Sequence, residues 1–169
     1  MESRERLLNI YRRVYAIPRL VKALKIAGVF SVIFIAGVFL YGIGVLAYAG
    51  EYIYLAHLVA VILVPFVLVS VMRLVINTER PYEVFDVDEL KGLRESGKSG
   101  RSFPSRHVFA AFLIGALWLP YSVPFGIATL ILGTFLAIER VILGIHFIKD
   151  AAVGAVIGIA SALIGMLFL

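Results

Sequence analysis

Long uncharged apolar stretches, separated by short polar segments, make up most of this chain. Three of them contain no Asp, Glu, Lys or Arg: residues 26–49, 52–72 and 151–169. Each is close to the ~20 apolar residues that a helix needs to cross a bilayer. A fourth such stretch, 108–138, is too long for one span and contains Pro120 and Pro124. Because two prolines so close together stop a helix, we expect a hairpin of two spans there, roughly over 104–119 and 124–144.

The N-terminal residues follow a different pattern. Leu7, Leu8 and Tyr11 recur at helical spacing, and arginines fill the other faces. Such a helix is too charged to span and is typical of one that lies on the membrane surface, although a solvated leader is an alternative. The whole pattern predicts an all-α integral membrane bundle of about five transmembrane helices. Residues 1–25 would form the amphipathic interfacial helix and residues 26–169 the transmembrane domain.

The composition agrees with a membrane protein. Hydrophobic residues make up 62% of the chain, whereas a soluble domain is typically about 45–50% apolar. The formal net charge is +5, and the basic residues flank the apolar stretches. Anionic lipid headgroups are therefore nearer partners than nucleic acid, which needs a basic face on a soluble module. The chain has no cysteine, which excludes disulfides and thiolate metal sites.

Five spans would collect three polar segments on one side of the membrane: the N-terminal helix, the loop 77–104 and the turn 139–150. The other two connections, near Gly50 and Pro120, contain no Lys or Arg. Lys and Arg near span ends collect on the cytoplasmic side of a membrane. We therefore expect a plasma-membrane protein whose polar face, including the 77–104 active-site loop, opens to the cytoplasm.

Arginine, serine and histidine on this face form a candidate anion site. Arg73, Arg80 and Arg140 carry guanidinium groups, which bind phosphate bidentately and stay charged at any working pH. Ser105 follows a proline and precedes an apolar stretch, which is typical of a helix N-cap, and the free amides of a helix start bind anions. His107 would lie on the first turn of that helix, where it could pass a proton to a leaving oxygen.

A histidine and a carboxylate complete the set. His146 and Asp150 are four residues apart, so they share one face if the segment is helical. A carboxylate bonded to one ring nitrogen fixes the imidazole tautomer and leaves the other nitrogen free to attack. With a proton donor and a cationic cradle, these groups supply what phosphoryl transfer requires without a metal. We expect no metal and no cofactor.

The order and spacing of these residues resemble the type 2 phosphatidic acid phosphatase family, which is related to vanadium-dependent haloperoxidases. The family pattern is a Lys, six residues and Arg-Pro, then Pro-Ser-Gly-His, and finally Ser-Arg, five residues, His, three residues and Asp. The matching segments lie within residues 73–150. Three separate motifs at the right spacing form a specific signal, whereas any one of them alone would be weak.

The resemblance implies a role for each matching position. His146 would attack phosphorus and form a phosphohistidine, Asp150 would orient it, and His107 would protonate the leaving oxygen. The implied phosphate-binding residues are Arg73, Arg80, Ser105 and Arg140, to which Arg106 adds a candidate contact. The sequence departs from the family pattern at three positions: Arg73 replaces Lys, Arg106 replaces Gly, and Glu139 replaces Ser.

We therefore expect a metal-independent membrane lipid phosphatase whose substrate is phosphatidylglycerophosphate, phosphatidic acid or a similar lipid. One alternative is a phosphatase of undecaprenyl or another polyprenyl diphosphate. A vanadate haloperoxidase would share the anion pocket but has no need of a bilayer, and a lipid-binding protein with a dead site would not require the intact histidines. The segment 92–99 also matches the Walker A pattern, but its neighbours fit neither the required strand nor the required helix, so we interpret it as a loop.

Overall fold

The computed structural model of the chain describes residues 2–85, 88–94 and 99–168. The described part contains no β-strand, and the all-α class expected from the sequence is confirmed. Its helices are α1 (Glu2–Tyr15), α2 (Pro18–Tyr48), α3 (Tyr52–Ile76), α4 (Pro81–Val84), the 3₁₀ turn η1 (Asp88–Leu90), α5 (Lys91–Arg94), α6 (Arg106–Trp118), α7 (Val123–Ile142) and α8 (Ile148–Met166). The Walker A match falls partly on residues 95–98, which lie outside the described residues.

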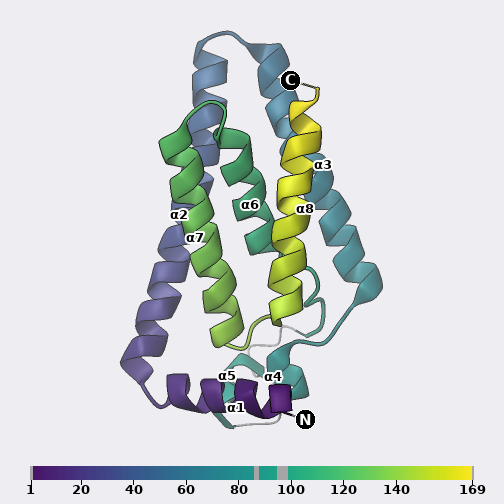
Figure 1. The fold of residues 1–169 in the computed structure, drawn as a ribbon. Coiled ribbons are helices and arrows are strands. Elements are labelled where there is room, and N and C mark those ends of the chain that lie inside the picture. The colour runs from purple at the N-terminus through teal and green to yellow at the C-terminus, as the bar shows by residue number, and fades with distance from the viewer. Residues whose placement is uncertain (1, 86–87, 95–98, 169) are drawn as a thin grey trace.

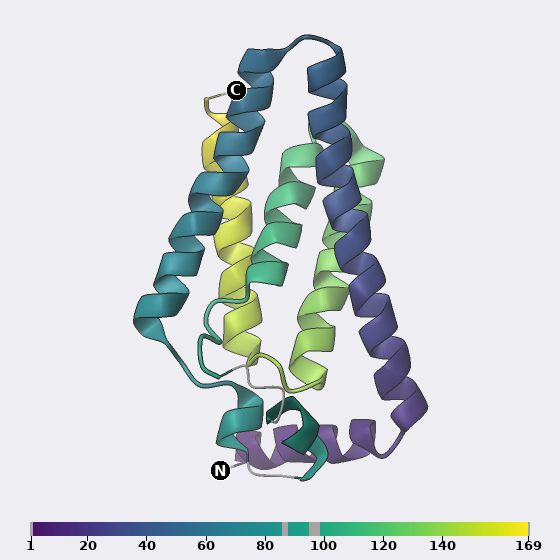
Figure 2. The ribbon, with the colours of Figure 1, turned by 180° about the vertical axis from the view of Figure 1, so that it is seen from behind.

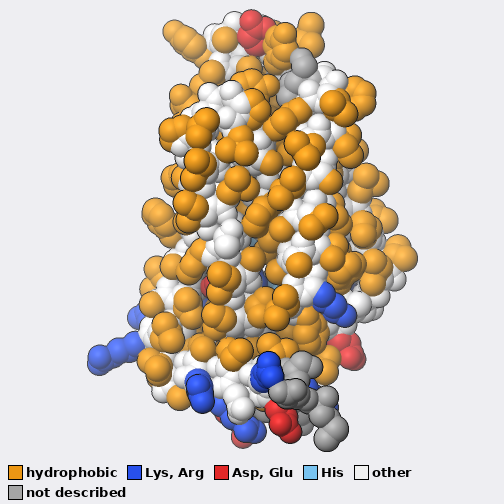
Figure 3. Space-filling model, in the orientation of Figure 1, with side chains coloured by type: hydrophobic (Ala, Val, Ile, Leu, Met, Phe, Trp, Pro, Cys, Tyr) orange, Lys and Arg blue, Asp and Glu red, His pale blue; other side chains and the backbone are white. Residues whose placement is uncertain are grey.

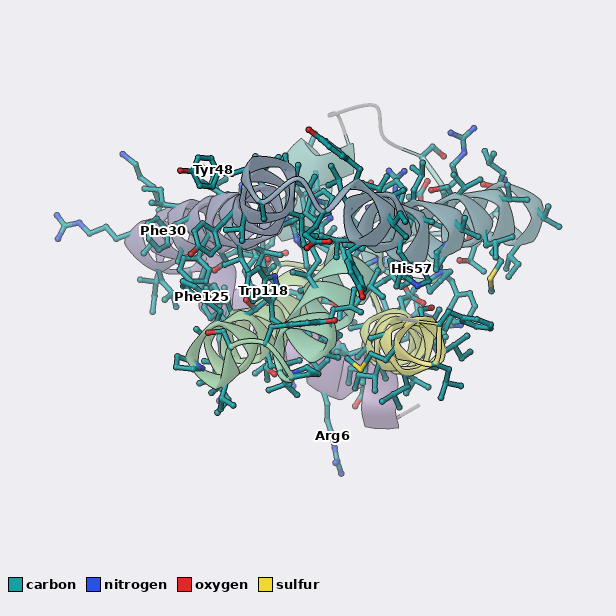
Figure 4. The ribbon with its side chains drawn as sticks, turned by 90° about the horizontal axis from the view of Figure 1, so that it is seen from above. Arg6, Phe30, Tyr48, His57, Trp118 and Phe125 are labelled. Carbon is teal, nitrogen blue, oxygen red and sulfur yellow. The ribbon has the colours of Figure 1, made fainter. Side chains whose placement is uncertain are left out.

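The helices α2, α3, α6, α7 and α8 stand upright, and α1 lies across their lower end beside α4 and α5 (Figure 1). Seen from above, α2 and α3 form one row, and α7, α6 and α8 form the other (Figure 4). From behind, α2 and α3 stand in front of α6 (Figure 2). Because α6 packs against α2, α3, α7 and α8, it is the central helix of the bundle.

Within the described residues, four helices are long and apolar enough to cross a membrane: α2, α3, α7 and α8. The central helix α6 has only 13 residues, which corresponds to about 20 Å against a hydrocarbon core of about 30 Å. The span expected over 104–119 is therefore a shorter helix, which begins after Pro104. Val108, Phe109 and Leu113 of α6 have no exposed surface, so this helix is enclosed by its neighbours rather than by lipid.

Two glycines of α8 allow it to pack closely against α6. A Cβ atom at Gly154 would lie 2.7 Å from the carbonyl oxygen of Ser105, and one at Gly158 would lie 2.5 Å from that of Phe109. Real Cβ atoms do not approach other atoms so closely, so only glycine permits this contact. The small-xxx-small spacing is typical of close packing between membrane helices. It brings the start of α8, which carries Asp150, next to the start of α6.

The helix expected over residues 2–25 is divided. The helix α1 ends at Tyr15, and α2 begins at Pro18, a residue favoured in the first turn of a helix because it has no amide hydrogen to leave unpaired. The segment 18–25 therefore extends the first span. Tyr11 of α1 is fully buried and packs with Phe85 and Leu90, so these residues cover one side of α1.

The outer surface separates by polarity. Hydrophobic side chains cover the upper part of the visible face, and Lys, Arg, Asp and Glu gather at the lower end, where α1 lies (Figure 3). This is also the end at which α6 and α8 begin and α3 and α7 finish (Figure 1). The polar residues of the three motifs therefore meet at one end of the bundle.

Candidate active site

The N-terminus of α8 is joined to the N-terminus of α6. The carboxylate oxygen Oδ2 of Asp150 accepts a hydrogen bond from the amide of Phe147 at 3.0 Å and so caps its own helix. The carbonyl oxygen of Asp150 accepts a hydrogen bond from the amide of Ser105 at 2.9 Å. Asp150 therefore fixes the relative position of the second and third motifs.

His146 lies in the tight turn between α7 and α8. Its amide donates to the carbonyl oxygen of Arg140 at 3.1 Å, and the turn passes through Gly144, whose φ of 71° favours glycine. His146 is only 3% exposed. The backbone thus holds the imidazole directly beside the last turn of the helix that carries Arg140.

Ser102, which the sequence pattern did not single out, lies between His146 and Asp150. Its Oγ is 3.2 Å from His146 Nδ1 and 2.5 Å from Asp150 Oδ2. The direct distance from His146 Nδ1 to Asp150 Oδ2 is 3.7 Å, which is longer than a hydrogen bond. The structure therefore brings the expected pair together, with a serine hydroxyl between them.

Arg73 is buried and holds the loop that precedes α6. Its Nη1 donates hydrogen bonds to the carbonyl oxygens of Ser102, at 3.0 Å, and of Pro104. The opposite side of this loop is held by Thr78, whose carbonyl oxygen accepts the Ser102 amide and whose hydroxyl accepts the Phe103 amide. Arg73 therefore shapes the Ser102–Pro104 segment, a role that its place in a phosphate-binding motif did not predict.

Arg80 is half-buried and is fixed by the loop that follows it. Its Nε donates to the carbonyl oxygen of Gly100 at 3.0 Å, and its amide donates to Glu83 Oε2 at 2.7 Å. Glu83 also accepts hydrogen bonds from the Gly100 amide and the Ser99 hydroxyl. Burial raises the pKa of this carboxyl, but these hydrogen bonds and the nearby Arg80 outweigh burial and hold the pKa below its usual value.

Arg140 and Arg106 contact different groups. Arg140 Nε lies 3.2 Å from the buried carboxylate of Glu139, in an ion pair that lacks hydrogen-bond geometry. The exposed Arg106 holds its guanidinium 5.8 Å from the centre of the Phe66 ring on α3, a cation–π distance. Arg73 is within electrostatic reach of Arg80 and Arg106, so several cations surround the motif residues.

Two further expected residues lie where an anion would meet this cluster. His107, on the first turn of α6, is within electrostatic reach of Arg140 and His146. The hydroxyl of Ser105 is buried and has no hydrogen-bond partner among the described residues. A buried polar group without a partner is costly, so this hydroxyl is available for a ligand.

The electrostatic surroundings of His146 favour the neutral imidazole. Burial lowers its pKa below the usual 6.5. The nearby Asp150 carboxylate opposes this shift, and the charges of Arg80 and Arg73 add to it. Neutral imidazole has a lone pair available for attack at neutral pH. The described residues contain no group of three or more His, Cys, Asp or Glu side chains that could hold a metal ion.

The chain belongs to the PAP2 superfamily, which it matches over residues 53–169. All three motifs lie within the matched part. Membership of this family, together with the apolar helices, supports a membrane lipid phosphatase.

Among solved structures, the chain is similar to the crystal structure of Aquifex aeolicus LpxE, with a TM-score of 0.69 and 24% sequence identity. The similarity covers 95% of this chain and 94% of that one, so the shared fold includes the N-terminal segment that precedes the family match. No protein in a search of curated sequences matches the chain.

Proposed function

We propose that the protein hydrolyses a lipid phosphomonoester or diphosphate, with His146 as the nucleophile. The observation that carries the proposal is the position of this imidazole. Its Nδ1 faces Ser102 and Asp150, and its surroundings keep it neutral. Several arginines lie close by. A neutral, oriented imidazole beside a cationic cluster suits attack on a phosphate anion.

The reaction would proceed in two displacements. In the first, His146 Nε2 forms a bond to phosphorus while the bond from phosphorus to the leaving oxygen breaks, and His107 gives that oxygen a proton. In the second, water attacks the phosphohistidine and gives its proton to His107, the N–P bond breaks and inorganic phosphate leaves. Each proton that His107 donates is thereby recovered in the same cycle.

The phosphate would be held at the start of α6. The amides in the first turn of a helix have no intrahelical partner and carry its positive dipole. The unpartnered Ser105 hydroxyl lies at this start. Arg80, Arg106 and Arg140 would neutralise the phosphate oxygens. Arg73 would add its charge, although its hydrogen bonds to two carbonyl oxygens also make it a support for the loop.

We propose phosphatidylglycerophosphate or phosphatidic acid as substrate, with a polyprenyl diphosphate as the alternative. The former two suit a site on the cytoplasmic face of the plasma membrane, where such lipids are made. That sidedness is supported by the surface arginines and lysines at the lower end of the bundle, which include exposed Arg12 and Arg13. Glu51, by contrast, is the only charged residue in the two connections at the upper end.

A phosphate-release assay would test this function. Purified protein in detergent or liposomes would receive each of the candidate lipids, with EDTA present. We expect phosphate release from at least one lipid, no loss of rate on chelation, and an acid-labile phosphoprotein when the reaction is quenched early. His146→Ala should abolish both signals while the protein still folds. Release within a few-fold of the parent rate by this variant would refute the proposed nucleophile, and loss of rate with EDTA that magnesium restores would refute metal independence.

A further inference from the structure

Ser102 belongs to the loop before α6, but its buried side chain points at His146 and Asp150. Its side chain has no exposed surface, and its Oγ contacts both His146 Nδ1, at 3.2 Å, and Asp150 Oδ2, at 2.5 Å. His146 and Asp150 are themselves 3.7 Å apart at their closest nitrogen and oxygen. Any hydrogen-bonded link between the imidazole and the carboxylate therefore passes through this hydroxyl.

The protons on Asp150 and Ser102 determine which group donates and which accepts in each of the two hydrogen bonds of Ser102. An ionised carboxylate can only accept hydrogen bonds, and a serine hydroxyl has one proton to donate. The short contact between Ser102 and Asp150 needs that proton, because two bare oxygens at this distance would repel each other. The lone pairs of Ser102 then face His146 Nδ1, so the ring must carry its proton on Nδ1. Its Nε2 is left with a free lone pair.

We propose that Ser102 is a positioning residue that passes the influence of Asp150 to His146 and fixes the tautomer in which Nε2 can attack. This inference rests on the function proposed above. Ser102 would stabilise the protonated Nδ1 throughout the reaction, while Asp150 holds the hydroxyl in place. No proton has to reach the carboxylate.

The backbone of Ser102 is held from two sides, which explains why its hydroxyl has a fixed position. Its carbonyl oxygen accepts a hydrogen bond from Arg73 Nη1 at 3.0 Å, and its amide donates to the carbonyl oxygen of Thr78 at 2.9 Å. Arg73 and Thr78 lie at the end of α3 and just beyond it. The last turn of α3 thus determines where the serine meets the imidazole.

The first test measures the tautomer of His146 directly. The chain has three histidines, so protein labelled with ¹⁵N in the imidazole rings gives three pairs of ring-nitrogen signals, and the His146→Ala variant identifies those of His146. We expect the parent protein to show a protonated Nδ1 and a bare Nε2 at neutral pH. A bare Nδ1 in the parent would overturn the proposal without any serine variant, so a folding failure could not obscure the answer.

The second test uses Ser102→Ala, with Ser31→Ala as the matched control. Ser31 is also a buried serine, but it donates to a carbonyl oxygen within α2. We expect Ser102→Ala to lower kcat by about tenfold to a hundredfold with little change in KM, and to mix the two tautomers, because the wrong tautomer has no free Nε2. The control should leave both unchanged.

A double variant tests whether Ser102 and Asp150 act on His146 together or independently. If Ser102 acts through Asp150, the combined Ser102→Ala and Asp150→Asn variant should be no slower than Asp150→Asn alone. Additive losses, or a parent-like kcat and tautomer in Ser102→Ala, would overturn the proposal. If no phosphate is released by the parent but the tautomer is as expected, the proposed function fails and the hydrogen-bond assignment stands.

Discussion

The Nε atom of Arg140 lies 3.2 Å from Oε2 of Glu139, its neighbour on α7. Glu139 is only 2% exposed, and a Cβ atom added at Gly28 of α2 would come within 3.0 Å of its other oxygen. A carboxylate enclosed in this way beside a candidate phosphate ligand offsets part of the positive charge available to an anion. It stands where the family pattern has a serine.

Glu139→Gln should therefore strengthen binding of phosphate analogues. The variant keeps the shape and one oxygen but removes the negative charge. We expect the inhibition constant for vanadate to fall by about threefold to tenfold, which corresponds to roughly 1 kcal/mol. Glu51→Gln, at the opposite end of the bundle, is the control and should leave inhibition unchanged. Weaker inhibition in Glu139→Gln would show that the carboxylate is needed to orient Arg140.

His107→Ala should slow hydrolysis according to the leaving group. Protonation of the leaving oxygen by a positioned acid is typically worth about 10²–10⁴ in rate. We expect a loss of this size on a lipid phosphate, whose alkoxide leaves poorly, and a much smaller loss on an aryl phosphate with an acidic phenol. Rates on the two substrates, measured for parent and variant, give the comparison. An equal loss on both would contradict the role of proton donor.

The rate should fall in acid as His146 becomes protonated. Because burial lowers its pKa below 6.5, the imidazole is neutral above that value and loses its lone pair only below its lowered pKa. We expect kcat at saturating lipid to fall on the acid side of pH 6.5. In Asp150→Asn this fall should move to still lower pH, since Asp150 raises the pKa of His146. Because the same lipid is used for the parent and the variant, ionisation of the substrate affects both pH profiles equally. A shift to higher pH would contradict the assignment.

Gly158→Ala should destabilise the bundle. The added methyl group would meet the backbone of α6, at 2.5 Å from the Phe109 carbonyl oxygen and 2.9 Å from the Leu113 amide, so the two helices must separate. Overpacking of this kind typically costs about 1–3 kcal/mol. The matched control is Gly37→Ala on α2, where nothing lies within 4 Å of the added atom. Thermal unfolding in detergent should show a lower midpoint for the first variant alone.

The sidedness can be tested with introduced cysteines because the chain has none of its own. Lys91 on α5 is exposed at the active-site end, and Tyr52 at the start of α3 is exposed at the other. If the active site faces the cytoplasm, an impermeant thiol reagent should label Tyr52→Cys in intact cells and Lys91→Cys only after lysis. The reverse pattern would place the active site outside the cell.

The overall architecture followed from the lengths of the apolar stretches, but two details of it did not. Pro18 begins a new helix and so divides the N-terminal segment. The amphipathic pattern of residues 2–25 does not show whether one helix continues through Pro18 or a second helix begins there. The helix α6 is shorter than the expected span, and four neighbouring helices enclose it. Hydropathy records that its residues are apolar but does not reveal whether lipid or protein surrounds them.

The motif spacing predicted that His146 and Asp150 lie together, since they are four positions apart in the chain. Ser102 could not be found in this way, because it reaches them across 44 and 48 positions of the chain and depends on how the loop before α6 folds. The same holds for Arg73, whose charge suggested a phosphate ligand and whose contacts with two carbonyl oxygens became visible only in three dimensions.

The N-terminal helix is attached to the turn that carries His146. The hydroxyl of Tyr15 donates a hydrogen bond to the carbonyl oxygen of Leu143 at 3.1 Å. Tyr11 packs next to Gly144, which lies two residues before His146 in the same turn. Any force that lifts α1 must break this hydrogen bond and expose a fully buried tyrosine. If α1 rests on the lipid headgroups, a crowded, stretched or strongly curved membrane would pull directly on the turn that carries the proposed nucleophile. The catalytic rate would then report the mechanical state of the bilayer as well as the amount of substrate in it.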